Sequence, residues 1–374
     1  MNVLSLFDGM SCGQLALKRA GISYDNYYAS EIDKHAIKVT MANFPNTIQL
    51  GDITKVSGYD LPKIDLLIGG SPCQGFSFAG KMLNFDDPRS KLFFEYVRIL
   101  HECREKNPDI VYLLENVRMK KEAELVITQA LNVYPIEINS ALVSAQSRRR
   151  LYWTNINSTH TDLFGCMIPG IEEPEDRGLF LKDIIEPEVN SKYYLTEKQI
   201  ESMIKRTEKN KARGTKFKFV PKEITQKANT IENEGRQDME ATYVFADYRS
   251  DEGLRIRRSG KTGTVNARAR EDVYGAGLVI THNLPRRMGK GKGGKGHLQK
   301  TDGKSYSVDT QNRQAVELLC GRIRRLSPIE CERLQTIPDN FTNHVSEAQR
   351  YKMIGNGWTI DVIVHLLRHW EFKT

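Results

Sequence analysis

The segment VLSLFDGMSCGQLAL, residues 3–17, indicates most clearly which fold this chain adopts. A short apolar run is followed by a polar turn that contains Gly9 and Gly13, and then by an amphipathic pattern that predicts a helix. Glycines at such a turn let the backbone lie close to a ligand, as in nucleotide-binding folds. The full G-x-G-x-x-G phosphate fingerprint is absent, which favours an adenosine cofactor without a pyrophosphate.

The alternation of short apolar runs and helical patterns continues through the first 154 residues. We expect strands at 3–7, 26–30, 64–69, 110–114, 136–143 and 151–154, and helices at 13–20, 34–43 and 91–104. Strands that alternate with helices of this length predict an α/β fold, with a doubly wound, mostly parallel sheet and helices on both faces.

The composition and the hydrophobic pattern of the sequence change after residue 155, and the earlier pattern returns near the C-terminus. The middle part is polar and rich in Gly, Arg, Lys and Thr. Helical patterning returns from Ile323, with Ser327 a good N-cap and Pro328 at the first helical position. We therefore predict a catalytic domain formed by residues 1–154 and 322–374, into which a smaller domain, residues 155–321, is inserted.

The positive charge of the chain is concentrated in one stretch. Residues 249–321 hold 15 Lys and Arg against 7 Asp and Glu, which accounts for the whole formal charge of +8. Such a concentration indicates a surface that binds a polyanion. A solvated basic loop is the alternative.

The composition favours a soluble protein of the cytoplasm. Hydrophobic residues make up 39% of the chain and charged residues 27%, and no apolar run approaches the roughly 20 residues of a membrane span. No signal peptide is recognisable after Met1. The six cysteines are scattered without a C-x-x-C pair, so we expect reduced thiols and no metal site.

Two acidic residues follow the predicted strands and are candidates for cofactor binding. Glu31, in ASEID, comes 22 residues after Gly9 and could accept hydrogen bonds from both ribose hydroxyls. Asp52, in GDI, is placed to meet the adenine amino group. Turn glycines and surface acids without a ligand remain the alternative interpretation.

Cys73 stands where an apolar strand runs into a turn, in DLLIGGSPCQG. Open α/β sheets place reacting groups at the carboxyl ends of their strands. A lone cysteine is more often a small packed hydrophobe. This one is flanked by turn formers and polar residues, which favours a nucleophile.

Two further segments carry groups suited to chemistry. IVYLLENV places Glu115 at the end of another predicted strand, where burial would favour the protonated form that a general acid needs. AQSRRRLYW places Arg148 and Arg150 two positions apart, on one side of the chain. An arginine run could equally be a phosphate clamp or a solvated face.

Taken together and in order, these segments resemble the C5-cytosine-specific DNA methyltransferases of bacteria and phages. The matching segments are FDGMSCG, SEID, GDI, PCQ, ENV, QSRRRLY, RRLSPIECERLQTIP and IGNGW. They cover roughly residues 1–154 and 322–374, and the gap between them is where that family keeps its target-recognition domain. The resemblance implies the class I methyltransferase fold and S-adenosylmethionine as cofactor.

The resemblance also implies a role for each matching residue. Cys73 would be the nucleophile that adds to C6 of a flipped cytosine, and Glu115 would bind N3 and supply its proton. Arg150 would bind the cytosine O2, and Arg148 would support the catalytic loop. The expected cofactor contacts are Phe7, Asp8, Gly9, Glu31, Ile32, Asp52, Pro72 and Asn356.

Two parts of the sequence depart from the family pattern or lie outside it. The closing box often reads G-N-S-V, whereas here Gly357 and Trp358 follow Asn356, and Trp358 could pack on the cofactor or on the sheet. The segment RRMGKGKGGKGHLQK, residues 286–300, nearly spells a phosphate-binding loop but has Gly296 where Ser or Thr is required. We expect DNA-backbone contacts from Lys290, Lys292 and Lys295, and base contacts from Thr264 and Arg268.

The expected partner is double-stranded DNA, bound by a monomer. A restriction endonuclease could act on the same site without forming a complex. Three alternatives remain: an RNA cytosine-C5 methyltransferase, a catalytically silent DNA-binding relative, and a nicotinamide-dependent oxidoreductase. The large basic insert disfavours the first, the presence of Cys73, Glu115 and Arg150 the second, and the Pro-Cys turn with the arginine pair the third.

Overall fold

The computed structural model of the chain falls into two compact units, each described here by itself. Unit 1 consists of Met1–Ile184, Lys227–Gln237 and Pro328–Thr374, and unit 2 of Ile185–Gln226 and Asp238–Ser327. Unit 1 thus includes residues 155–184, which the sequence assigns to the inserted domain. The structure describes residues 1–72, 88–158, 160–196, 198–200, 202, 227–228, 243–249, 253–255, 278–283, 298–300, 314–319 and 321–370.

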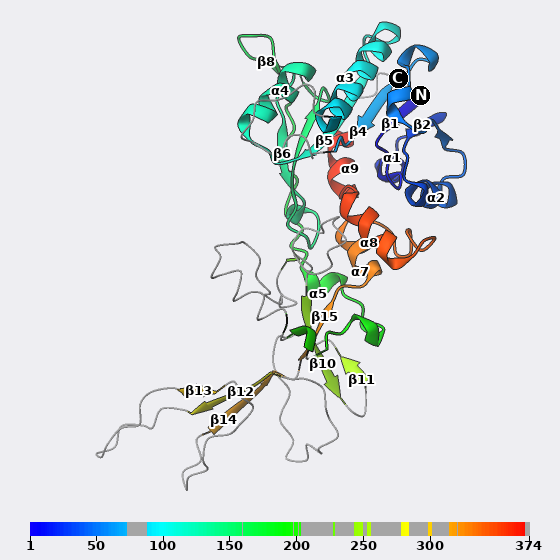
Figure 1. The fold of residues 1–374 in the computed structure, drawn as a ribbon. Coiled ribbons are helices and arrows are strands. Elements are labelled where there is room, and N and C mark those ends of the chain that lie inside the picture. The colour runs from blue at the N-terminus through cyan, green and yellow to red at the C-terminus, as the bar shows by residue number, and fades with distance from the viewer. Residues whose placement is uncertain are drawn as a thin grey trace. The chain divides into compact units, whose positions relative to one another are not determined.

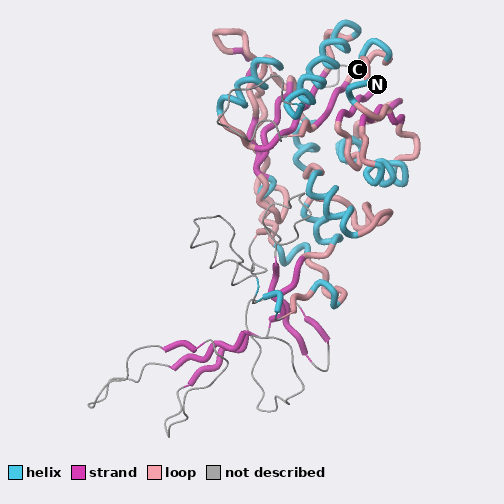
Figure 2. Tube along the Cα trace, viewed as in Figure 1, coloured by secondary structure: helices cyan, strands magenta, loops and turns pink. Residues whose placement is uncertain are grey.

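Unit 1 is built on a seven-stranded sheet with the order β3-β2-β1-β4-β5-β7-β6. Its strands are β1 (Asn2–Leu6), β2 (Asn26–Ser30), β3 (Ile48–Gln49), β4 (Leu66–Gly69), β5 (Val111–Val117), β6 (Ile136–Asn139) and β7 (Arg149–Thr154). Strands β1 to β5 are parallel to one another, and β7 is antiparallel to both β5 and β6. This confirms the predicted mostly parallel α/β fold, with the sheet bordered by helices (Figure 2).

Eight helices of unit 1 are described. They are α1 (Cys12–Ala20), α2 (Lys34–Asn43), α3 (Pro88–Lys106), α4 (Lys121–Leu131), α5 (Leu181–Ile184), α7 (Pro328–Leu334), α8 (Glu347–Asn356) and α9 (Ile360–Arg368). Helix α7 begins at Pro328, as the sequence predicts. In the described part of the chain, no helix is both long and apolar enough to span a membrane.

The two faces of the sheet are covered by different helices. Leu4 and Leu6 belong to an apolar cluster with Phe93 and Tyr96 of α3. The opposite face is covered by α1 and α9, which contact each other (Figure 1). Helix α1 lies so close that a Cβ on Gly13 would come within 2.3 Å of the Ile68 side chain, so this close packing requires glycine.

Several element boundaries differ from those predicted. The strand expected at 136–143 ends at Asn139, because the Asn139 side chain accepts a hydrogen bond from Ala141 N and begins a 3-10 turn, Ser140–Leu142. Strand β3 and helix α4 were not predicted. Unit 1 also carries a short hairpin, β8 (His160–Thr161) and β9 (Met167–Ile168).

Unit 2 contains short antiparallel strands, in contrast to the parallel sheet of unit 1. They form two three-stranded sheets, with the orders β11-β10-β15 and β13-β12-β14. The strands are β10 (Tyr243–Arg249), β11 (Gly253–Arg255), β12 (Leu278–Asn283), β13 (Leu298–Lys300), β14 (Gln314–Leu319) and β15 (Gly321–Arg325).

Candidate active site

The loop that follows β1 has an unusual backbone. Phe7, Gly9 and Ser11 all have positive φ, at 59°, 60° and 58°. This conformation is uncommon for residues other than glycine and is strained for a bulky Phe, and such strain is concentrated at functional sites. The loop is tied to the end of β2 by a hydrogen bond from Asp8 N to Ser30 O at 3.1 Å. A Cβ on Gly9 would meet nothing within 4 Å, so the loop borders open space.

Glu31 holds this loop against the turn after β2. Its Oε2 accepts a hydrogen bond from Gly9 N at 2.8 Å, and its Oε1 accepts from Ile32 N and Asp33 N, both at 2.8 Å. A carboxylate has about four lone-pair sites, so roughly one remains for a ligand. The Glu31 carboxylate can therefore bind both ribose hydroxyls, as predicted, only if one of these three backbone N–H groups moves away from it.

Asp8, a predicted cofactor contact, has its side chain turned into the protein. Its carboxyl group is buried and accepts hydrogen bonds from Ser11 Oγ and from Tyr27 OH, the latter at 2.8 Å. Burial raises the pKa of Asp8 to about 6, although these hydrogen bonds work in the other direction. The side chain thus fixes the loop from inside, and only the backbone of Asp8 is left for a cofactor.

The other predicted cofactor contacts combine apolar and polar surface suited to adenosine. Ile32, after β2, is 75% exposed, and Pro72, after β4, and Asn356, at the end of α8, are also exposed. Asp52 accepts hydrogen bonds from Thr54 N and Oγ1 through Oδ1, which leaves Oδ2 for a ligand. The hydrogen bond from the Thr54 backbone lowers the pKa of Asp52, so the carboxylate stays ionised and able to accept a further hydrogen bond. With Glu31, this set fits S-adenosylmethionine: carboxylates for hydroxyl and amino groups, and an apolar side chain for the ring.

Glu115 lies at the carboxyl end of β5 and is buried. Its Oε1 is 3.0 Å from Arg150 Nε, in an ion pair whose N–H is not aligned for a hydrogen bond. Its Oε2 accepts a hydrogen bond from Trp358 Nε1 at 3.2 Å. The structure therefore brings together three side chains that are far apart in the sequence, and it places the Trp358 indole against a carboxylate.

Asn116, next to Glu115, connects the ends of two strands. Its Nδ2 donates hydrogen bonds to Ser71 O at 3.2 Å and to Ser71 Oγ at 3.1 Å. Ser71 directly precedes Pro72 and Cys73. The sequence motif ENV thus supplies the buried carboxyl group of Glu115 and an amide that anchors the backbone ahead of the predicted nucleophile. The sequence alone did not reveal this second contact.

Arg148 is buried, and its guanidinium group binds the backbone of the closing box, IGNGW, residues 354–358. Its two terminal nitrogens donate to Gly355 O and Gly357 O, each at 3.1 Å. A Cβ on Gly357 would come within 2.7 Å of the terminal methyl group of Met10, so the closing box lies directly against the loop after β1. Burial lowers the pKa of Arg148 to about 10, and the neighbouring Arg150 acts in the same direction. Arg148 and Arg150, two positions apart in the sequence, thus have different partners.

Several predicted residues lie outside the described part of the chain. Cys73 is one of them, and the five predicted DNA contacts are the others: Lys290, Lys292, Lys295, Thr264 and Arg268. Their roles stay predictions. Within the described residues, no group of three or more His, Cys, Asp or Glu side chains is arranged to hold a metal ion.

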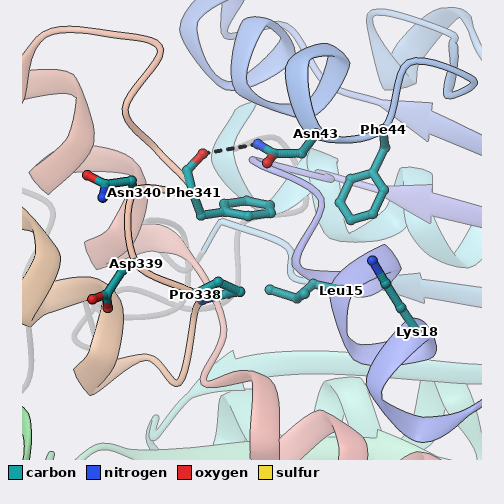
Figure 3. A pocket seen from close by; sticks show the side chains of 8 residues that line it. All are labelled: Leu15, Lys18, Asn43, Phe44, Pro338, Asp339, Asn340 and Phe341. Atoms are coloured by element: carbon teal, nitrogen blue, oxygen red, sulfur yellow. Dashed lines mark hydrogen bonds between the residues drawn. The ribbon is translucent and has the colours of Figure 1, made fainter.

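A separate pocket is lined by side chains of α1, of the C-terminal end of α2 and of residues 338–341. It has a volume of about 250 Å³ and includes a hydrogen bond from Asn43 Nδ2 to Phe341 O at 3.0 Å (Figure 3). It is lined by Leu15, Lys18, Asn43, Phe44, Pro338, Asp339, Asn340 and Phe341. None of these is a predicted site residue, so we do not assign the reaction to this pocket.

Solved structures of methyltransferases share the fold. The Entamoeba histolytica methyltransferase EhMeth aligns over 99% of this chain and 97% of its own, with a TM-score of 0.63 and 15% identity. The S. pombe Dnmt2 methyltransferase aligns over 98% and 97%, with a TM-score of 0.62 and 17% identity. At this identity the likeness shows the fold alone, which is that of the class I methyltransferases.

Known sequences match along nearly the whole chain. The orphan methyltransferase M.SPRI of Bacillus phage SPR is 29% identical over 98% of this chain and 97% of its own. The type II methyltransferase M.HhaI of Haemophilus parahaemolyticus is 26% identical over 98% and 93%. The sequence model of the C-5 cytosine-specific DNA methylases matches residues 1–371. The chain therefore belongs to the C-5 cytosine-specific DNA methylase family, whose members are S-adenosylmethionine-dependent DNA methyltransferases.

Proposed function

We propose that this enzyme methylates C5 of a cytosine flipped out of a specific duplex DNA sequence, through a covalent adduct between Cys73 and C6. The observation that supports this most directly is the placement of Glu115. It is a buried carboxyl group at the end of β5, paired with Arg150, and the neighbouring Asn116 binds the backbone two residues before Cys73. This brings an acid, a cation and the nucleophile's segment to one edge of the sheet.

The chemistry follows from the poor reactivity of C5 in cytosine. The Cys73 thiolate adds to C6, the C5–C6 double bond opens, and Glu115 gives a proton to N3 as charge develops there. Arg150 holds the cytosine O2. S-adenosylmethionine, when bound, would supply the electrophilic methyl group that the activated C5 accepts, and would leave as S-adenosylhomocysteine. A base then removes the C5 proton, and the electron pair restores the double bond as the thiolate leaves. N3 returns its proton to the Glu115 carboxylate, which restores the neutral base and the acid.

The cofactor is held, in this proposal, by Glu31, Ile32, Asp52 and Asn356 beside the loop at Gly9. We expect Glu31→Gln to weaken S-adenosylmethionine binding by roughly 10- to 100-fold. This factor corresponds to the free energy that a hydrogen bond to a charged group contributes. The amide offers one oxygen to the backbone donors and the ligand together, where the carboxylate offers two.

Titration calorimetry with S-adenosylmethionine measures this effect without any turnover. Glu137→Gln is the matched control, because Glu137 on β6 pairs with the exposed Arg149 at 2.9 Å and is not among the predicted contacts. Both variants should melt close to the wild-type temperature. Unchanged affinity in a folded Glu31→Gln enzyme would remove Glu31 from the cofactor site.

DNA binding is assigned in this proposal to the basic stretch, residues 249–321. Flipping a base costs a few kcal/mol, and phosphate contacts offset that cost. We propose that Lys290, Lys292 and Lys295 contact the backbone, while Thr264 and Arg268 read bases. The enzyme would act as a monomer, and a restriction endonuclease for the same site would not form a complex with it.

Replacing Lys290, Lys292 and Lys295 together with Ala should weaken binding to target and non-target duplexes alike. Each lost phosphate contact lowers the log–log salt slope by about 0.9, so the slope should flatten by up to about 2.7. Binding is followed by fluorescence anisotropy over a range of salt. Alanine at Lys18, Lys63 and Lys121, which are exposed in unit 1, is the control and should leave the slope unchanged. An unchanged slope in the first variant, or methylation of new sequences, would contradict the assignment.

The substrate is tested with purified enzyme, isotopically labelled S-adenosylmethionine and either duplex DNA or RNA of the same sequence. Nucleoside mass spectrometry then identifies the product. We expect labelled 5-methylcytosine from the duplex DNA. Label that enters RNA and not DNA would support the alternative of an RNA methyltransferase and overturn the proposal.

A further inference from the structure

The contact between Trp358 and Glu115 lies outside the roles assigned so far. Trp358 is 8% exposed, and its Nε1 donates to Glu115 Oε2 at 3.2 Å. We propose that Trp358 is a positioning residue, whose indole N–H fixes the Glu115 carboxyl group toward the cytosine N3 and sets the pH range in which it acts. This inference rests on the proposed function of Glu115.

Three elements of unit 1 surround the carboxyl group of Glu115. Arg150 of β7 approaches Oε1 at 3.0 Å, and Trp358, between α8 and α9, approaches Oε2. On a third side, a Cβ added to Gly70 would lie 3.1 Å from both Glu115 Oε2 and Trp358 Nε1. The carboxyl group is therefore flanked by the Arg150 guanidinium, the Trp358 indole and the Gly70 backbone, and Trp358 is the neighbour that donates a hydrogen bond to it.

The chain on both sides of Trp358 is anchored, which favours a preorganised position of its indole. Arg148 binds the carbonyl oxygens of Gly355 and Gly357, on the N-terminal side of Trp358. On the C-terminal side, Thr359 Oγ1 donates to Gln335 Oε1 at 2.7 Å and lies 2.9 Å from Ser140 Oγ. An indole on a chain segment that is anchored on both sides can hold its partner with little reorganisation.

The neighbours of Glu115 keep their charge state over the pH range of an assay. They are Arg148, Arg150 and Tyr152 on β7, and Cys12 on α1. Burial raises the pKa of Cys12 to about 12 and also raises the pKa of Tyr152, so both are neutral. The pKa of Arg148 is lowered only to about 10. A shift of the pH–rate profile near neutral pH would therefore not come from Cys12, Tyr152 or Arg148.

Removal of the indole N–H should have two consequences. The carboxylate anion loses a hydrogen bond, so the protonated acid, which is the proton donor, persists to higher pH. We expect the high-pH limb of the pH–rate profile to move up by roughly one pH unit. This shift corresponds to a tenfold change in the equilibrium between the protonated acid and its anion. The rate at the optimum should fall roughly tenfold, because the carboxyl group is less well oriented.

The test compares Trp358→Phe with Trp153→Phe in single-turnover methyl transfer to duplex DNA across a pH series. Trp153 is a matched control: it is fully buried, and its Nε1 donates to Thr128 Oγ1 at 3.1 Å, away from Glu115. Both variants lose one indole N–H, and only Trp358→Phe should shift the profile. Gly70→Ala disturbs the same contact without changing Trp358 and should shift the profile in the same direction.

A double variant separates positioning from a merely structural effect. Trp358→Phe should add nothing in a Glu115→Gln background, because the group that it positions no longer carries a proton. An unshifted profile in Trp358→Phe and Gly70→Ala, or an effect that multiplies with Glu115→Gln, would overturn the inference. Failure of the proposed function looks different: the wild type would make no 5-methylcytosine, or Glu115→Gln would be fully active.

Discussion

Cys73→Ala should abolish methyl transfer and should also abolish covalent trapping on a duplex that carries 5-fluorocytosine at the target position. The thiolate adds to C6 and the methyl group enters at C5, but the carbon then carries fluorine where a proton must leave. The adduct cannot be resolved, so the wild-type protein stays attached to the DNA. Affinity for S-adenosylmethionine should be nearly unchanged in the variant, because the predicted cofactor contacts are other residues.

Denaturing gel electrophoresis reports the trapped complex, and calorimetry reports the cofactor affinity. Cys166→Ala is the matched control, since Cys166 is a partly exposed free thiol outside the predicted site. It should trap and methylate as the wild type does. Trapping that persists in Cys73→Ala, or full activity in that variant, would show that another group attacks the base or that no adduct forms.

Glu115→Gln should lower the rate of the chemical step by roughly 10²- to 10⁴-fold, the usual worth of general acid catalysis. The amide keeps the shape of the side chain and can still accept the hydrogen bond from Trp358 at its oxygen. It has no acidic proton to give to N3. DNA affinity should change much less than the rate.

Single-turnover rates at saturating enzyme, together with binding isotherms on the same duplex, separate these two quantities. Glu137→Gln, which removes a charge on the neighbouring part of the sheet, should retain the wild-type rate. If binding collapses while the rate per bound complex stays normal, Glu115 holds the structure together and does not donate the proton.

The core of the fold was predictable because its strands are short apolar runs separated by helices with clear periodicity. Strand β3 was missed because two residues, Ile48–Gln49, carry no recognisable period. Helix α4 was missed for another reason. Its sequence KEAELVITQAL contains Val126, Ile127 and Thr128, β-branched residues that favour strands when judged locally.

The site was predictable as a set of residues but not as a set of contacts. Glu115, Arg150 and Trp358 meet because β5, β7 and the segment after α8 converge, which no local pattern encodes. The sequence left Trp358 with a choice between cofactor and sheet, and the structure shows a third partner. The inward orientation of Asp8 was likewise hidden, since it depends on Tyr27 of a different strand.

The most direct test of the account is the DNA of cells that express this chain, sequenced with a chemistry that reports 5-methylcytosine. We predict 5-methylcytosine at one recurring sequence in cells with the wild-type protein, and none at that sequence in cells with Cys73→Ala. Unmodified cytosines throughout the DNA of cells that contain folded wild-type protein would contradict it, as would methylation at that sequence that survives the loss of Cys73.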